Sequence, residues 1–453
     1  MARLDAGASP LAYRVAVLLL WGLAANAAIA CRGLFWDGSS FLVNIIELGE
    51  VHDFYTARAH VDWLTQGPVL LAIKLGVRDI HVLATVYSAT LFALPVALYH
   101  GALARLRHDG VALAIAMLVL LVVWLPTSFF IVGEYNVTYA AALAAMAVTL
   151  VPGRSRLADA VLLVALGLLS VRSYEAMVYL GPLLAAAILW TWRGEPDPAL
   201  RGLAVVAALA FLGGAVVAGA TIAEYWSHPH FVKVRATSIA FWENLQLVIP
   251  LAGLVLCALV GLVFPAWLRG RGPQLVLGVV AVALVLSPWY RLLDDHSILY
   301  PPAHYLARQA TGVAIFGLLV GLWLQVAWRQ PPRVLAVLRE PAVSGRLTAT
   351  LAVVLIAAAV PDVALTNLWT EYIARMRGLV DHEEGIVHAR DLPVLEWPDK
   401  LFAQDWTLPA MSALVSRTPG RATVLADNDY RSNPPFDPTC GTLPRLTGYG
   451  WGR

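Results

Sequence analysis

Charged residues are scarce in this chain, and cysteine is almost absent. Only 14% of the 453 residues are Asp, Glu, Lys or Arg, whereas a soluble domain carries about 25%. The net charge is +2 and the charges are thinly spread, so nothing indicates a nucleic-acid-binding surface. The three cysteines, Cys31, Cys257 and Cys440, are far apart and form neither a CxxC pair nor a metal-site spacing. These absences argue against a disulfide framework and against nucleic acid as a partner.

Hydrophobic residues, in contrast, make up 59% of the chain, which is more than a soluble core can bury. Most of this apolar surface must therefore face membrane lipids or other spans. About eleven apolar runs, bounded by charged residues, Pro or Gly, predict an all-α polytopic membrane protein. The predicted spans are 11–31, 80–104, 111–132, 136–151, 157–172, 175–192, 202–224, 245–268, 274–290, 310–328 and 347–367. The first run is too long for the core of a signal peptide, so we interpret it as a retained span.

Short, arginine-bearing connections follow the second, fourth, sixth, eighth and tenth of these runs. Because cytoplasmic loops are enriched in Lys and Arg, we expect these connections and the N-terminus in the cytoplasm. An odd number of spans then places the C-terminus outside the cytoplasmic (inner) membrane. The sequence therefore predicts a transmembrane domain over 1–367, with an outer loop over 32–79, and an extracytoplasmic cap or small domain over 368–453.

Amphipathic segments in the outer loop predict helices at the membrane surface. One covers 41–47, and a second over 68–76 is too short to span the bilayer. The polar, proline-rich tail contains one strand-like run, 422–426. Near the end of the tail, Tyr449 and Trp451 either contact an acceptor or pack the tail against the rest of the protein.

An aspartate, Asp37, lies a few residues beyond the first span, in the stretch FWDGSS. A carboxylate at the boundary between water and lipid is partly desolvated, which raises its basicity. Asp37 therefore suits a general base that takes the proton of an acceptor hydroxyl. The alternative is that Asp37 caps a helix that begins near Ser39, since Asp is a favoured N-cap residue.

This arrangement resembles the GT-C glycosyltransferases, membrane enzymes that move a sugar from a polyprenyl-phosphate carrier to an acceptor on the outer face. In the branch with protein O-mannosyltransferases and lipid A aminoarabinose transferases, the first outer loop opens with an aspartate that a second acid often follows. Asp37 matches this aspartate, but Gly38 follows it. The stretch 65–71 (TQGPVLL) resembles the later Lys/His-x-Pro-Pro-Leu segment of that loop, with one proline and no preceding basic residue.

The resemblance covers roughly residues 11–110 and extends further only through the layout of the spans. It implies a GT-C-like fold and the transfer of a sugar from a polyprenyl phosphate to a glycan, lipid or protein acceptor of the cell envelope. It also implies that Asp37 is the catalytic residue. Because Gly38 stands in place of the second acid, a divalent metal cofactor is left open and no residue is predicted as a metal ligand.

Two short connections on the outer face carry further candidate substrate ligands. Glu134 and Asn136 could hold the hydroxyls of a sugar, or they could belong to a tight turn. Arg172 could bind phosphate, and Glu175 could orient the acceptor. Alternatively, Arg172 and Glu175 neutralise each other, because residues three apart are neighbours on one helical face.

The longer outer segment 291–309 is rich in residues that could bind the donor. Displacement at an anomeric carbon needs cations that stabilise the leaving phosphate, and the forked donors of Arg suit this role. The alternative is an interfacial belt of aromatic residues with ordinary arginines. The candidate substrate ligands in this segment are Arg291, Asp294, His296, His304 and Arg308.

Two other classes of function remain open from the sequence. A transporter or flippase of a lipid-linked glycan would also need polar residues and a basic phosphate site. Such a protein should carry ionisable residues deep within its spans, whereas here the polar residues gather on one face. This asymmetry favours an enzyme that acts at one membrane surface. A non-catalytic membrane assembly subunit is the third interpretation.

Overall fold

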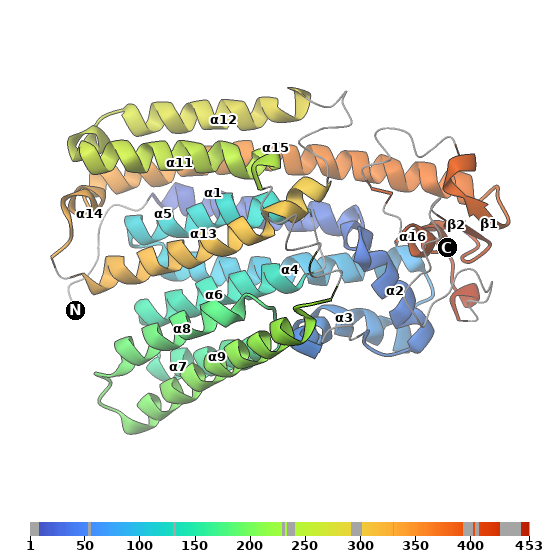
Figure 1. Cartoon of the computed structure of the whole chain (residues 1–453), viewed down its shortest axis with the longest axis horizontal. Coiled ribbons are helices and arrows are strands. Elements are labelled where there is room, and N and C mark those ends of the chain that lie inside the picture. The colour runs from blue at the N-terminus through green and yellow to red at the C-terminus, as the bar shows by residue number, and fades with distance from the viewer. Residues whose placement is uncertain are drawn as a thin grey trace.

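The computed structural model describes residues 9–52, 56–129, 133–228, 232, 241–290, 301–328, 330–392, 402–403, 407–425 and 445–452. Long helices form a bundle in which their axes run roughly side by side (Figure 1). The short helix α14 (Arg333–Leu338) lies at one end of this bundle. Helices α2 (Asp37–Leu48), α3 (Ala59–Lys74) and α16 (Leu408–Val415) lie at the opposite end. The segment 329–346 and the outer loop are therefore at opposite ends, as the arginine pattern predicts.

Each of the predicted apolar runs overlaps a helix of the bundle. These helices are α1 (Pro10–Ile29), α4 (Ile80–Leu106), α5 (Gly110–Val119), α6 (Glu134–Leu150), α7 (Arg156–Val171), α8 (Met177–Trp192), α9 (Pro198–Tyr225), α11 (Leu245–Val263), α12 (Gly272–Tyr290), α13 (Pro301–Ala327) and α15 (Pro341–Val380). Helical turns continue α5 as far as Thr127. Within the described ranges, seven helices are long and apolar enough to cross a bilayer: α1, α4, extended α5, α9, α11, α13 and α15. The protein is an all-α polytopic membrane protein.

Helix α12 shows how the outer surface of the bundle meets lipid. Leu275 and Val279 are each 70% exposed, and Val282 and Leu286 continue the same face. This spacing of three and four residues places all of them on one side of the helix. An apolar stripe of this kind would be unfavourable in water, but it suits the hydrocarbon of a bilayer.

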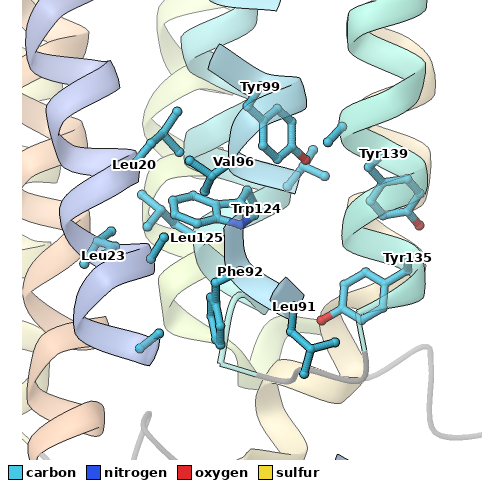
Figure 2. Close-up of a cluster of buried hydrophobic side chains, with 14 of the residues drawn as sticks. Leu20, Leu23, Leu91, Phe92, Val96, Tyr99, Trp124, Leu125, Tyr135 and Tyr139 are labelled. Carbon is cyan, nitrogen blue, oxygen red and sulfur yellow. The ribbon is translucent and has the colours of Figure 1, made fainter. Parts of the chain in front are cut away.

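Helix α6 is enclosed by its neighbours, and every one of its 17 residues is buried. It packs against α4 and α8. In the core beside it, the rings of Tyr99 and Trp124 lie 6.3 Å apart between α4 and the continuation of α5. Tyr135 and Tyr139 lie one turn apart on α6, and the hydroxyl of Tyr135 points toward this core (Figure 2). A helix that is surrounded by protein needs no apolar stripe for contact with lipid. Its hydropathy alone therefore does not show how it is packed.

Only one of the two predicted surface helices keeps an exposed apolar face. In α3, Trp63, Leu64 and Leu71 are about half exposed, as an interfacial helix requires. In α2, the apolar residues Leu42, Val43, Ile45 and Ile46 are buried, and the helix packs against α16. The apolar face of 41–47, which the sequence predicts to rest on lipid, is therefore covered by the cap.

The cap grows directly out of the last long helix. Helix α15 continues through Val380, so the predicted boundary between 367 and 368 falls inside a helix. Strand β1 (Gly385–His388) pairs in parallel with β2 (Ala422–Leu425), which confirms the strand predicted over 422–426. The fall in hydropathy after 367 therefore does not mark where the helix ends.

The end of the tail is fastened to the outer loop and to α4. The backbone N–H of Ile80 donates to the carbonyl of Gly450 at 2.8 Å, and Leu446 N–H donates to the Glu47 carboxylate at 2.8 Å. Tyr449 and Trp451 are buried. Of the two interpretations of these aromatic residues, the structure confirms that they pack the tail against the protein.

Candidate functional site

A tight turn between α1 and α2 fixes the position of Asp37. Cys31 and Trp36 adopt positive φ values of 53° and 57°, which side chains other than glycine rarely accept. A Cβ atom on Gly38 would lie 1.7 Å from the carbonyl oxygen of Gly33. Position 38 therefore admits only glycine, which gives a physical reason why no second acid follows Asp37.

Helix α2 begins at Asp37 itself, and its N-cap residue is Trp36, without a side-chain capping bond. The alternative that Asp37 caps a helix starting near Ser39 is therefore wrong. The half-buried Asp37 carboxylate lies in the first turn of α2.

Two further carboxylates approach the same region from other elements. Tyr87 on α4 lies within electrostatic range of Asp37, Asp62 and Glu134. Asp62, in the first turn of α3, is 3% exposed, and Glu134, the first residue of α6, is 1% exposed. The sequence prediction missed Asp62 because it started the second surface helix at residue 68, whereas α3 starts at Ala59.

Next to these carboxylates lies a group that we call the Arg58 cluster, defined by Arg58, Glu134, Tyr174, Glu175 and Arg308. Arg58 Nε and Nη2 donate to Glu175 Oε1 at 3.1 and 2.8 Å. Arg58 Nη1 lies 3.5 Å from Glu134 Oε1, and the guanidinium lies 5.2 Å from the Tyr174 ring. One arginine from the outer loop thus joins two acids that come from separate connections.

Arg308, near the start of α13, completes the cluster. Its guanidinium carbon lies 4.5 Å from the centre of the Tyr135 ring and 5.7 Å from that of Tyr174. It also attracts both carboxylates, Glu134 and Glu175. Contact with two tyrosine rings holds the guanidinium in place.

The carboxyl of Glu175 lies in the connection between α7 and α8, outside both helices. Burial acts to raise its pKa, but the attraction of Arg58 and the hydrogen bonds from Arg58 outweigh burial and lower the pKa overall. Glu175 is therefore ionised at neutral pH. Its partner is Arg58, so the interpretation that Arg172 and Glu175 neutralise each other is wrong.

Two buried acceptor atoms of the cluster region have no hydrogen-bond donor among the residues that the structure describes. They are Oε2 of Glu134 and Oδ1 of Asn136, both in the first turn of α6. A buried acceptor without a donor costs about 1–3 kcal/mol, so such atoms are usually satisfied by a ligand or by water. A sugar hydroxyl is a donor of the kind that both atoms lack.

The other predicted site residues are not brought into this cluster by the described part of the chain. Arg172 is exposed at the end of α7, where its carbonyl accepts a hydrogen bond from His60 N–H at 3.1 Å. His304 lies in the first turn of α13. Arg291, Asp294 and His296 lie outside the described residues.

A second buried ion pair joins the first and last spans. Arg32 Nη1 and Asp362 Oδ1 lie 2.7 Å apart, and their side chains are 1% and 3% exposed. Arg32 also donates to the Ser128 carbonyl at 3.1 Å, and Ser128 Oγ donates to Asp362 at 2.6 Å. The sequence prediction missed this pair, although Arg32 directly follows a span at the end where arginines were not expected. Asp362 lies inside an apolar run, which is the other signal that could have found it.

Within the described ranges, no three His, Cys, Asp or Glu side chains come together as a set that could hold a metal ion. Comparison of the chain with protein-family models, with curated proteins and with solved structures found no match. The resemblance to GT-C enzymes therefore rests on the outer-loop motif and on the layout of the spans.

Proposed function

We propose that the protein is a glycosyltransferase that moves a sugar from a polyprenyl-phosphate donor to an acceptor at the outer face of the cytoplasmic membrane. One observation carries the proposal. Glu134 and Glu175 meet at Arg58, and Arg308 attracts both carboxylates, although the three residues come from separate parts of the chain. Glu134 and Asp37 in turn lie within electrostatic range of the same tyrosine, Tyr87.

In the proposed reaction a base activates the acceptor, and a cation stabilises the leaving group. Asp37 takes the proton of an acceptor hydroxyl as its oxygen attacks the anomeric carbon. The bond between that carbon and the phosphate oxygen breaks, and the polyprenyl phosphate leaves with the electron pair. Arg308 stabilises the negative charge that develops on this phosphate. Glu134 and Asn136 accept hydrogen bonds from hydroxyls of the sugar.

The buried ion pair of Arg32 and Asp362 gives little support to the interpretation of the protein as a transporter. Arg32 and Asp362 hydrogen-bond each other and also Ser128 and Thr366, so they form a buried network between helices. A transport pathway instead needs ionisable groups that can exchange partners. The network is better explained as a fastening of α1 to α15, and the enzyme remains the preferred proposal.

Replacing Arg308 with Gln should weaken the use of the lipid-phosphate donor. Loss of one charge-assisted contact to a leaving group costs about 2–4 kcal/mol in transition-state binding, which is roughly 30- to 1000-fold in kcat/KM. The measurement is steady-state transfer from a synthetic polyprenyl-phosphate sugar by the purified protein. Lys74→Gln is the matched control, because Lys74 is an exposed cation at the same end of the bundle. Equal losses in both variants, or no loss in Arg308→Gln, would place the phosphate elsewhere.

The orientation of the chain provides a separate test. A reporter fused after Arg453 should be active only outside the cytoplasm, and one inserted within 329–346 should be active only in the cytoplasm. The physical reason is the arginine content of the connections, which retains them in the cytoplasm during insertion. The reverse pattern would place Asp37 on the side of the nucleotide sugars and would remove the reason for a lipid-linked donor.

A further inference from the structure

A cavity of about 520 Å³ lies in the cap, away from the Arg58 cluster. One wall is the last part of α15, and the other is the turn that joins α16 to β2, at the end of the molecule where these elements meet (Figure 1). The first wall carries Arg377 and His382, and the second carries Arg417 and Arg421. The cavity shares no residue with the candidate catalytic site.

The lining of this cavity is strongly basic. It contains three arginines and one acid, Asp381, which gives a formal charge of +2 with His382 neutral. The acid is engaged through both oxygens, because Ser416 Oγ and the backbone N–H of Arg417 donate to its Oδ1 at 3.0 and 2.8 Å, and Arg417 Nε forms an ion pair with its Oδ2 at 3.5 Å. Asp381 therefore shapes the turn and offers little repulsion to an anion. Arg421 pairs with Glu384, which lies outside the lining.

Of the arginines that line the cavity, Arg377 is the one best placed to bind a ligand. Its guanidinium carbon lies 5.2 Å from the centre of the Trp451 ring. Its Nε is buried and has no hydrogen-bond partner, and within the described residues no carboxylate forms an ion pair with it. Stacking on an aromatic ring fixes a guanidinium without occupying its donors. The donors of Arg377 are thus oriented before any ligand arrives.

The shape and size of the cavity decide which anion it suits. A planar carboxylate is satisfied by the fork of a single arginine. A tetrahedral phosphate presents oxygens in several directions and so matches arginines on two opposite walls. The volume lies within the range of about 300–1,000 Å³ that is typical of small-molecule sites. It therefore has room for a phosphate together with the group to which it is esterified.

We propose that this cavity binds the phosphate group of a phosphorylated saccharide or of a phospholipid headgroup, with Arg377 as its principal ligand. The site does not depend on the proposed glycosyltransferase activity.

The test uses the purified full-length protein in detergent and measures binding by calorimetry. The probes are glucose 1-phosphate and short-chain phosphatidylglycerol, with glucose as the uncharged reference. Arg377→Gln should weaken binding of the active probe about 10- to 100-fold, the loss expected for one hydrogen bond to a charged group. Arg375→Gln is the matched control, because Arg375 lies two residues away on α15 and outside the cavity.

A second variant blocks the cavity without removing a charge. Gly378 lines the cavity, and a Cβ atom there would meet no other atom within 4 Å. Gly378→Leu should keep the helix intact, since Leu favours a helix more than Gly does, and should abolish binding. Binding of glucose 1-phosphate alone assigns a soluble saccharide, and binding of phosphatidylglycerol alone assigns a lipid headgroup. The proposal is overturned if neither probe binds, or if Arg375→Gln weakens binding as much as Arg377→Gln.

Discussion

Replacing Asp37 with Asn should give a folded protein whose sugar transfer is slower by about two to four orders of magnitude, the usual contribution of a general base. The amide keeps the size of the carboxylate but cannot accept the proton of the acceptor hydroxyl. The rigid turn around Gly33 and Gly38 should hold the new side chain in the same position. The measurement is single-turnover transfer with the donor bound, which separates the chemical step from donor binding.

Asp79→Asn is the control for this experiment. Asp79 is a true N-cap, whose Oδ1 accepts hydrogen bonds from His81 N–H and Val82 N–H at 2.8 and 3.3 Å. Asn caps a helix about as well as Asp, so transfer should stay near the wild-type rate. Asp37→Asn protein with normal melting and near-normal transfer would show that Asp37 is not the base. Movement of the lipid-linked sugar across liposomes without any new glycosidic bond would instead identify a flippase.

Removing the Asp362 side chain should strongly destabilise the protein. Asp362→Ala leaves Arg32 buried and charged without its counterion, which costs about 3–5 kcal/mol. Melting of the purified protein in detergent, followed by intrinsic fluorescence, measures the loss. Glu340→Ala breaks the exposed pair with Arg269 and should change the melting temperature little, because exposed pairs contribute little.

The double variant Arg32→Met with Asp362→Leu separates the cost of an unpaired charge from the value of the pair. Replacing both partners by apolar residues removes the buried charge, so stability should return to within about 1–2 kcal/mol of the wild type. The remaining loss comes from Ser128, which donates to Asp362 and accepts from Arg32, and from Thr366, which also accepts from Arg32. A double variant as unstable as Asp362→Ala would contradict this account.

The helices could be predicted from the sequence because apolar runs and their boundaries are local properties. Polar residues in the connections mark where several of these helices begin. The N-cap residues next to predicted spans are Asp79, Asp109, Ser155 and Asp197. The number of helices that cross the membrane was harder to predict from the sequence. In α6, which is enclosed by protein, length and hydropathy no longer report contact with lipid.

The candidate site could be predicted only in part, because ion pairs are formed by tertiary contacts. Glu134, Glu175 and Arg308 were chosen for their unusual position near apolar runs, and the structure brings them together. The common partner of the two acids, Arg58, lies in a polar loop where an arginine gives no signal. The failed pairing of Arg172 with Glu175 has the same origin: sequence spacing suggested a helical neighbour, but the chain leaves the helix after Val171.

Helix α15 is 40 residues long, which is about 60 Å at 1.5 Å per residue. This is about twice the thickness of the hydrocarbon core of a bilayer. Pro361 removes one hydrogen bond near the middle of the helix, and the next residue, Asp362, is bound to Arg32. We expect the helix to bend at this point, where the Arg32–Asp362 pair holds it to the segment that follows α1. A tilt of about 5° in the outer arm of roughly 30 Å would move its far end by about 2.5 Å. Arg377 lies in that outer arm, so such a tilt would move one wall of the cavity in the cap.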